Sequence, residues 1–430
     1  MVHLNLSIGW SGAFLIITLL LILLLLLYLR GTFRGKIEYR MKDIPDLEDP
    51  LFTLTIAGLS TSLETDAELT GFWSEPDAIY AARLAAVRSA QRTIYFETFY
   101  MTPGRRAQEF AAALTEQALA GVKVQLIADH FGVITLPKEY WRRLAAAGID
   151  VHFFHRFDWK APLNYLGRSH RKLLIIDGKV ALTGGAGVSD HWDGMKKTGD
   201  TAPWLDCEVR FEGAIVTTLE AIFMQHWLYT GGNASLGLEI SETDPANAAT
   251  VLVTPSDSSY RVSPIDTLFY MSVLAAKERI WIASPYFLLE PNLRSALLTM
   301  KKKGIDVRVL TVGPRNDKKL VYYAVRDLFG DLLAAGIEIY EYQPSMMHAK
   351  VLLIDNHWVS MGSANFDPRS FFQNDELNVS MAEPKLTKKV EHFFLSAFPK
   401  SHCVDTLEWK NRSLWSRILG QFALFLSWQL

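Results

Sequence analysis

Cysteine is nearly absent from this sequence, and neither sign of charge is in excess. Cys207 and Cys403 are the only cysteines in 430 residues, which excludes a fold stapled by disulfides and favours a reducing compartment. The 44 Lys and Arg residues nearly balance the 46 Asp and Glu residues, which gives a net charge of −2. This charge gives no support for a nucleic-acid partner, which a basic surface would favour.

The N-terminal stretch lacks charge altogether. Residues 1–29 contain no Lys, Arg, Asp or Glu, and residues 13–29 are a nearly unbroken Leu and Ile run, long enough to span a bilayer. No basic segment precedes the run and no small-residue cleavage site follows it, which argues against a cleaved signal peptide. Basic residues come directly after it: Arg30, Arg34, Lys36, Arg40 and Lys42. We therefore expect residues 1–30 to be a single-pass anchor in the inner (cytoplasmic) membrane, with the body on the cytoplasmic side.

Two further segments flank the body. Residues 31–75 are basic at first and then mixed, with Pro45 and Pro50, and are expected to form a juxtamembrane segment and linker. Within residues 405–430, apolar side chains recur at helical spacing at Leu414, Trp415, Ile418, Leu419, Phe422, Phe425 and Leu426. This pattern is typical of an amphipathic helix on a membrane surface, and it fits a helix packed on the protein equally well.

The body carries one motif twice. Residues 169–177 read SHRKLLIID and residues 347–355 read MHAKVLLID, so each copy is a His, a Lys two residues on, four apolar residues and an Asp. The neighbourhoods match too, pairing residues 92–96 with 279–282, 121–124 with 304–307, 146–150 with 334–338, and 184–186 with 362–364. The repeat is too long for a solenoid. We expect an α/β fold of two fused α-β-α-β halves, residues 76–245 and 246–404, facing one another.

The apolar part of each motif predicts a strand. Residues 173–176 and 351–354 are short apolar runs, as expected for strands buried on both faces. Because side chains alternate along a strand, His170 shares a face with Lys172, and His348 shares a face with Lys350. A single such histidine would more often be structural, whereas two matching copies indicate histidines that act together.

The turn after each strand places further candidates. Asp177 and Asp355 fall on the other phase, at two-residue hairpin signals, and we expect them to fix the turn or brace the lysines rather than act on substrate. The returning strand brings Ser363 and Asn365 level with the second His and Lys. Both are candidates for contact with the reacting group.

Two histidines and two lysines that converge on one cleft suit a phosphodiester. One neutral imidazole can attack phosphorus, and the other, protonated, can give its proton to the leaving alkoxide. Lys172, Lys350, Ser363 and Asn365 would stabilise the negative charge on phosphorus oxygens. This chemistry needs no metal and no cofactor, and the sequence has no acidic cluster that would supply a metal site.

The nucleophilic imidazole also needs a carboxylate or carbonyl on its far nitrogen. Asp206 in the first half and Glu376 in the second lie at matching positions after the repeated motifs. A solvent-facing role for each is an equally compatible interpretation.

These residues resemble the phospholipase D superfamily, and within it the bacterial cardiolipin synthases, over roughly residues 75–400. The most specific parts are the two His-x-Lys-x4-Asp motifs and the run of residues 362–371, GSANFDPRSF, with further similarity at residues 284–287 and 340–344. The resemblance implies two phospholipase D-like halves related by a pseudo-two-fold axis, with the active site at their interface. It implies a two-step phosphatidyl transfer with His170 as nucleophile, His348 as general acid and base, and Asp206 and Glu376 as the orienting carboxylates.

One departure from the family pattern separates the halves. The Gly-Ser-x-Asn pattern is complete at residues 362–365, but residues 184–187 read GGAG, without the hydroxyl and the amide. The two half-sites are therefore chemically unequal, and which histidine is the nucleophile stays open.

Four functions remain in competition. The first is a membrane-anchored phosphatidyltransferase that forms cardiolipin from two phosphatidylglycerol molecules, with phospholipid and the bilayer as partners. The second is a phospholipase D that hydrolyses phospholipid to phosphatidic acid. A phosphodiesterase acting on nucleic acid is disfavoured by the neutral charge, and a non-catalytic lipid-binding scaffold by the intact motifs. The sequence leaves the donor headgroup, the acceptor and the oligomeric state undetermined.

Overall fold

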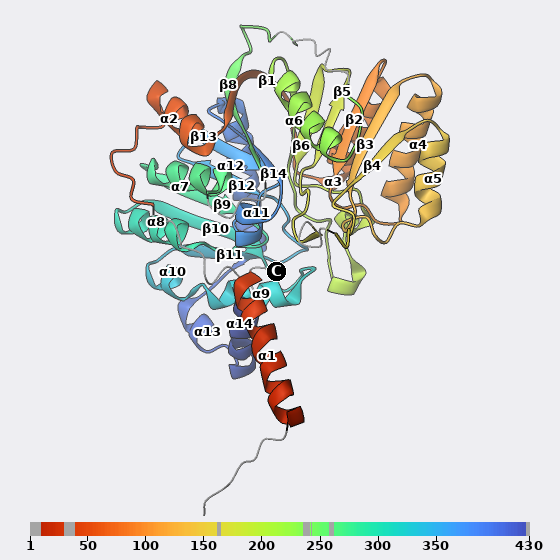
Figure 1. Ribbon diagram of the computed structural model, residues 1–430. Coiled ribbons are helices and arrows are strands. Elements are labelled where there is room, and N and C mark those ends of the chain that lie inside the picture. Colours follow the sequence, from red (N-terminus) through yellow and green to blue (C-terminus); the bar gives the residue numbers. More distant parts are fainter. Residues whose placement is uncertain are drawn as a thin grey trace, which may run out of the picture.

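The computed structural model describes residues 10–29, 39–160, 165–234, 241, 243–257 and 262–426 (Figure 1). The first half contains β1 (Leu63–Trp73), α3 (Pro76–Ser89), β2 (Thr93–Thr98), α4 (Arg105–Leu119), β3 (Lys123–Asp129), α5 (Lys138–Ala146), β4 (Asp150–Phe154), β5 (Leu173–Ile176), β6 (Val180–Gly184), β7 (Glu208–Glu212) and α6 (Ile215–Tyr229). Its β6–β7 connection carries two short 3₁₀ turns, Asp190–Asp193 and Lys196–Thr198.

The second half follows the same order. It contains β8 (Ala249–Ser256), α7 (Pro264–Leu274), β9 (Arg279–Ala283), α8 (Pro291–Lys302), β10 (Asp306–Val312), α9 (Lys319–Asp327), α10 (Gly330–Ala334), β11 (Glu338–Tyr342), β12 (Val351–Ile354), β13 (Trp358–Gly362), α11 (Pro368–Phe372), β14 (Glu376–Met381), α12 (Pro384–Ala397) and β15 (Ser401–Cys403). The predicted strands 173–176 and 351–354 are confirmed at both ends as β5 and β12.

Within the described ranges, fifteen strands form one sheet, and all but the edge strand β15 have a counterpart across the β8–β1 pair. The order is β15-β11-β10-β9-β12-β13-β14-β8-β1-β7-β6-β5-β2-β3-β4, so equivalent strands lie at equal distances on either side of the β8–β1 pair. That pair is antiparallel, with Leu63 opposite Val253 and Ala67 opposite Ala249. An antiparallel pair between two equivalent sets of strands is the arrangement that a two-fold axis produces. The strand order therefore confirms the predicted duplication.

Helices cover both faces of the sheet (Figure 1). In the first half α3, α4 and α5 pack on one face over a buried apolar cluster, and in the second half α7, α8 and α9 do the same. On the opposite face, α6 and α12 share a third buried cluster that includes side chains of both halves, among them Phe223 and Phe393. Because the β5 and β12 residues are buried on both sides, their apolar runs have no polar face.

The segment predicted as a linker is partly built into the body. Residues 50–60 form α2 (Pro50–Ser60), capped by the Asp49 side chain, whose Oδ1 accepts a hydrogen bond from Leu51 N at 2.9 Å. Phe52 of this helix is buried, with its ring edge-on to that of Trp358 at 5.3 Å. Residues 63–73 form the central strand β1. Mixed polarity suggested a linker, but β1 lies between β8 and β7 and pairs with both.

The predicted anchor is described only in part. Residues 10–29 form α1 (Trp10–Leu29), without a charged residue and with mostly exposed side chains, and residues 1–9 and 30 lie outside the described residues. Among the helices in the described ranges, none is found with the length and apolarity needed to cross a membrane. The transmembrane role of residues 1–30 stays a prediction.

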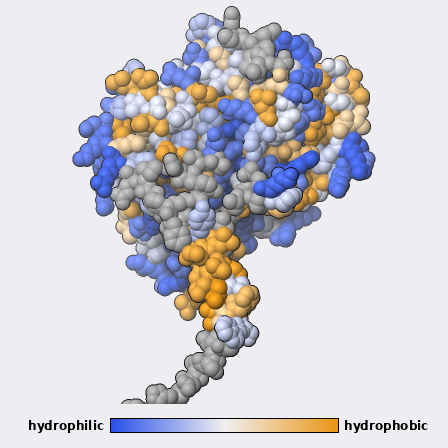
Figure 2. Space-filling model, in the orientation of Figure 1, coloured by the Kyte–Doolittle hydropathy of each residue, from blue (hydrophilic) through white to orange (hydrophobic). Residues whose placement is uncertain are grey.

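The C-terminal segment has two different faces. After α13 (Thr406–Lys410), helix α14 (Leu414–Phe425) packs on α9, where Gly420 and Ala423 are buried and Arg412 pairs with Asp327. The large apolar side chains on its other face are exposed: Leu414, Trp415, Ile418 and Phe422. Figure 2 shows apolar surface gathered on the side of the molecule where α1 and α14 project. Of the two roles left open by the sequence, packing on the protein accounts for one face, and the other is free to meet a membrane.

Candidate active site

The two motifs meet in one cavity between the halves. The cavity has a volume of about 290 Å³, and both His170 and His348 line it, together with Lys172 and Asn365. In each half the motif His and Lys come just before the first strand of the hairpin, β5 or β12. The second, antiparallel strand, β6 or β13, ends beside them. Gly362 N, for example, donates to Lys350 O at 3.4 Å. The cavity is therefore lined by the histidines of both motifs.

Each histidine is oriented by a carboxylate of the other half. His170 Nδ1 lies 2.9 Å from Glu376 Oε2, and His348 Nδ1 lies 2.8 Å from Asp206 Oδ2. The backbone crosses at the same places, because His170 N donates to Asp375 O at 2.8 Å and His348 N donates to the first half as well. In both pairs Nδ1 faces the carboxylate, which leaves Nε2 for the reacting group.

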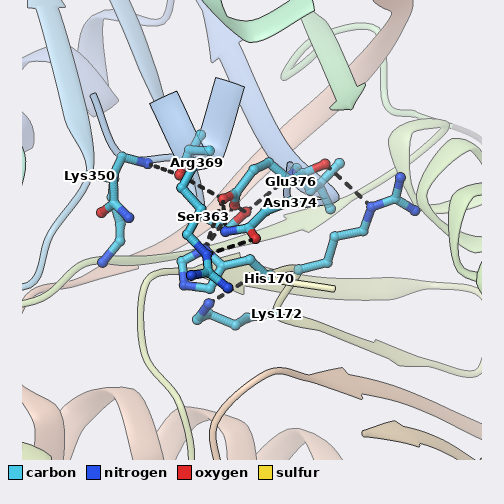
Figure 3. A network of polar contacts seen from close by, with 12 residues as sticks. His170, Lys172, Lys350, Ser363, Arg369, Asn374 and Glu376 are labelled. Atoms are coloured by element: carbon cyan, nitrogen blue, oxygen red, sulfur yellow. Dashed lines mark hydrogen bonds and ion pairs between the residues drawn. The ribbon is translucent and has the colours of Figure 1, made fainter. Parts of the chain in front are cut away.

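The Glu376 carboxylate is held by a cluster of donors from the second half (Figure 3). Ser363 Oγ donates to Oε2 at 2.5 Å, and Ser370 Oγ donates to Oε1 at 2.7 Å. Asn374 Nδ2 adds a longer contact of 3.4 Å to Oε1. Ser363, predicted to touch the reacting group, thus points to the orienting carboxylate instead.

The first half holds its carboxylate differently, and this explains its missing serine. Asp206 Oδ2 accepts a hydrogen bond from Trp192 Nε1 at 2.9 Å. A Cβ on Gly185 would lie only 2.1 Å from Asp206 Oδ1, so the shorter Asp lies where a side chain at Gly185 would have to be. The indole N–H does for Asp206 what the Ser363 hydroxyl does for Glu376.

Substituting serine for Gly185 is therefore expected to lower activity by roughly a hundredfold, because it displaces Asp206 and with it the ring of His348. The measurement is the initial transfer rate of the purified variant, alongside its thermal melting temperature. Gly58→Ser is the matched control, since a Cβ at Gly58 meets no atom within 4 Å. Full activity in Gly185→Ser would show that the position of Asp206 does not matter.

The pKa of each motif histidine lies below its ordinary value. Burial, followed by Lys172 and Lys350, holds the pKa of His170 well below its ordinary value. Burial likewise lowers the pKa of His348 to about 4, with Lys350 adding to the effect. The same two causes, burial and the neighbouring lysines, thus lower the pKa of both histidines.

The pKa values of the Asp206 and Glu376 carboxyl groups shift in opposite directions. Burial alone would raise the pKa of Asp206, but His348 and Lys350 outweigh it and lower that pKa to about 2. Burial raises the pKa of Glu376, and the cation of Lys172 only partly offsets this. An ionised carboxylate thus stands beside His348, while His170 is paired with a more weakly acidic group.

The motif lysines are buried, and the pKa of each ammonium group is lowered. Lys172 Nζ donates to His170 O at 2.6 Å, and Lys350 Nζ lies 2.9 Å from His348 Nδ1. Burial lowers the pKa of Lys350 to about 8. Burial and the neighbouring Lys350 also lower the pKa of Lys172.

These lysines predict a loss of substrate capture in alkaline solution. Because a cation whose pKa is lowered loses its proton as pH rises through that value, kcat/KM is expected to fall above about pH 8. A rate profile from pH 6 to pH 10 in detergent micelles measures it. Lys350→Arg should move the midpoint upward, since Arg keeps its charge. An unchanged midpoint would assign the alkaline limb to another group.

The motif aspartates lie at the far end of their strands. Asp177 Oδ1 accepts hydrogen bonds from Arg92 N at 2.7 Å and Thr93 N at 2.8 Å, and Asp355 Oδ1 accepts from the equivalent Glu278 N at 2.8 Å. Both aspartates have positive φ, 55° and 52°. Each hairpin closes with three residues, not the two that the sequence indicated. This geometry favours the turn-fixing role over contact with substrate.

A buried histidine outside the motifs ties the halves together. His226 Nδ1 lies 2.6 Å from Glu97 Oε1, and its Nε2 lies 3.1 Å from Asp375 Oδ2. Ser169 Oγ donates to the same Glu97 oxygen at 2.6 Å. Burial and Arg171 lower the pKa of His226, but Glu97 and Asp375 outweigh them and raise it. The link fixes the residues that flank the first histidine–carboxylate pair.

The cavity wall beyond the motif residues includes aromatic, amide and charged side chains. The His348 ring packs beside the rings of both Trp192 and Trp204, at 5.1 and 5.8 Å, and Phe99 meets the His170 ring at 4.9 Å. Asn365 Oδ1 is buried without a hydrogen-bond partner. In the part of the chain that the structure describes, no group of three His, Cys, Asp or Glu side chains is placed to hold a metal ion.

Comparison with known proteins agrees with this geometry. Residues 84–227 and 272–397 match the family model described as "Cardiolipin synthase, PLD-like domain". The chain belongs to this cardiolipin synthase family. It is 32% identical over 368 residues to a cardiolipin synthase of Geobacillus thermodenitrificans, covering 84% of this chain and 72% of that one. It is 30% identical over 405 residues to a cardiolipin synthase of another Geobacillus, covering 92% and 79%.

A solved structure shares the fold of this cardiolipin synthase family member. Phosphatidylserine synthase of Haemophilus influenzae aligns with a TM-score of 0.66 at 12% identity, over 88% of this chain and 99% of that one. At this identity the likeness speaks for the fold alone.

Several site residues of this family member escaped the sequence argument. Trp192 and Ser370, which donate to the two carboxylates, have no matching partner in the other repeat. His226 lies outside both motifs, and nothing in its local sequence marks it. Arg168 carried a signal that went unused, since it lies two residues before His170 and so shares the phase of the motif.

Proposed function

We propose that this chain is a phosphatidyltransferase that joins two phosphatidylglycerol molecules into cardiolipin and releases glycerol. One observation carries the proposal: two histidines line a single cavity, and each has its Nδ1 fixed by a carboxylate from the other half. Such a site can hold a covalent intermediate on one imidazole and move a proton with the other. The curated relatives that carry the cardiolipin synthase name support the choice of substrate.

The proposed reaction has two balanced steps. In the first, Nε2 of His170 attacks the donor phosphorus, the bond from phosphorus to the glycerol oxygen breaks, and His348 gives its proton to that oxygen. In the second, a hydroxyl of the acceptor lipid attacks the phosphohistidine, the phosphorus–nitrogen bond breaks, and His348 takes the hydroxyl proton. Lys172 and Lys350 stabilise the charge on phosphorus oxygens throughout.

The unequal carboxyl groups support this division of labour. The ionised Asp206 stabilises a positive charge on His348, as a general acid requires. Glu376 has a raised pKa and offers less of this stabilisation, so His170 stays neutral and nucleophilic. The negative charge of a bound phosphodiester raises the pKa of a nearby histidine, and the ionised Asp206 favours proton uptake from solvent by His348 rather than by His170.

Lipid analysis tests the proposed function. Purified full-length protein is incubated with vesicles of phosphatidylglycerol alone, and the products are identified by mass spectrometry. We expect cardiolipin and free glycerol in equal amounts, without any nucleotide-activated lipid, and no product from His170→Ala. Phosphatidic acid as the sole lipid product at every substrate density would instead identify a hydrolase, the alternative function.

We also propose that residues 1–30 attach the chain to the inner membrane, with the body on the cytoplasmic side. The uncharged α1 with its exposed side chains and the exposed apolar face of α14 support this. Deleting residues 1–30 is expected to lower the fraction that floats with anionic vesicles while leaving the melting temperature unchanged. Unchanged flotation would place the attachment elsewhere, and a C-terminal reporter active only outside the cytoplasm would overturn the orientation.

A further inference from the structure

The alternation of the first motif continues on its N-terminal side to a third basic residue, Arg168. Arg168, His170 and Lys172 alternate with residues of the other phase, and all three line the cavity. The matching position in the second repeat is Met346, which is buried in the apolar core and carries no charge. A cation at this position is therefore a property of one half only.

The buried guanidinium of Arg168 lies over the Tyr165 ring at 3.9 Å, and one of its nitrogens lacks a hydrogen bond. The Arg168 side chain is 2% exposed, and Nη2 has no hydrogen-bond partner among the described residues. Its Nη1 donates to His155 O at 3.3 Å and lies 3.5 Å from Asp129 Oδ1. That carboxylate is already shared, because its oxygens accept the backbone N–H groups of three other residues. A buried donor without a partner is costly, and because Arg168 lines the cavity, an anionic ligand there would offset that cost.

Two further cations surround the same part of the cavity. Arg369, on α11, is half-buried with Nε 3.4 Å from Asn374 Oδ1, and Figure 3 shows it close to His170. Lys318 stands exposed at the rim, its Nζ 5.0 Å from the centre of the Tyr286 ring. Both line the cavity, as Arg168 does. None of the three belongs to the repeated motif.

We propose that Arg168, Arg369 and Lys318 form a second phosphate subsite, which binds the phosphodiester of the incoming acceptor lipid. The proposal rests on the proposed function and deepens it, because it makes the acceptor an anionic phospholipid. The ligand class is a phosphate diester that does not react, held beside the one that does.

The spacing separates the two phosphates. Lys172 lies two residues to one side of His170 and Arg168 two residues to the other, about 6.6 Å along an extended chain. A phosphorus bound to His170 is thus near the motif lysines. Arg168 can then bind a second phosphate that a short carbon chain connects to the reacting hydroxyl. In phosphatidylglycerol a three-carbon bridge separates the reacting hydroxyl from the phosphate. When that hydroxyl attacks the phosphohistidine and gives its proton to His348, its own phosphate keeps all its bonds.

Competition between acceptors tests the subsite. The purified full-length enzyme is given phosphatidylglycerol in nonionic detergent micelles together with 1-butanol, and cardiolipin and phosphatidylbutanol are measured together. In Arg369→Gln and Arg168→Met, the ratio of cardiolipin to phosphatidylbutanol is expected to fall at least about tenfold, as the loss of a charge-assisted bond predicts. Lys319→Gln is the matched control, because Lys319 is exposed and bonds only to Pro314 O in the described structure.

The outcomes separate the two proposals. If both products fall in parallel, the cations serve the donor phosphate, and the subsite is wrong while the proposed function stands. If the wild type forms phosphatidylbutanol but no cardiolipin, the proposed function itself fails and the subsite falls with it. Arg168→Met introduces the residue of the second repeat and tests the buried position. Should it not fold, as its melting curve would reveal, Arg369→Gln decides alone. An unchanged ratio in Arg369→Gln overturns the subsite.

Discussion

Alanine at either His170 or His348 is expected to lower phosphatidyl transfer by at least about three orders of magnitude, because covalent attack and proton transfer act as one coupled unit. The two variants should nonetheless differ in one measurement. With a phosphatidyl ester of p-nitrophenol, whose leaving group needs no acid, His348→Ala should still form a covalent lipid–enzyme adduct. His170→Ala should form none.

The measurement is labelling with a radioactive lipid, quenched in dodecyl sulfate at alkaline pH because the phosphorus–nitrogen bond is acid-labile, followed by peptide mapping of the phosphohistidine at the same pH. Lys319→Gln, which leaves the cavity untouched, serves as the positive control. Labelling of His170→Ala and not of His348→Ala would exchange the roles of the two histidines. Labelling of both variants would contradict a single covalent site.

Removing either orienting carboxylate is the second large expected effect. Asp206→Asn and Glu376→Gln should each lower the transfer rate by roughly two to four orders of magnitude, since an amide favours the wrong tautomer of the histidine it faces. Both side chains are fully buried, so melting curves must accompany the rates.

The crossed geometry predicts which pairs are coupled. Asp206 contacts His348 and acts through it, so in the His348→Ala background Asp206→Asn should cost little more when the p-nitrophenyl substrate is used. In that same background Glu376→Gln should still reduce labelling strongly, because Glu376 orients His170. The reverse pattern would mean that each carboxylate serves the histidine of its own half.

The duplication made much of the fold predictable. Two matched sets of apolar runs and glycines defined two halves, and the symmetric strand order follows from them. β1 escaped this logic, because a strand that pairs with the other half has no periodic signal of its own in a mixed, acidic segment. Its place is fixed by β8, which lies far along the chain.

The histidines and lysines were predictable for the same reason, whereas their partners were not. Repetition marks residues that both halves share, but Trp192 at Asp206 and Ser363 at Glu376 solve the same problem with different chemistry. The glycine-rich segment at Gly185 indicated a half-site without the serine hydroxyl. In the structure the Asp206 carboxylate occupies the space where a side chain at Gly185 would lie. Neither an alignment of the two halves nor a local sequence pattern predicts that a residue elsewhere in the chain takes the place of the missing side chain.

The interface between the two halves determines how the activity of the protein depends on enzyme concentration. Both histidine–carboxylate pairs of the repeated motifs span this interface, so a half on its own holds a histidine without its carboxylate and a carboxylate without its histidine. Were the halves separate chains, assembly would depend on collision and would fail at low copy number. Their fusion replaces that bimolecular step by docking at an effective concentration on the order of millimolar. The specific activity of this chain should therefore be independent of enzyme concentration, down to levels at which a site assembled from two subunits would fall apart.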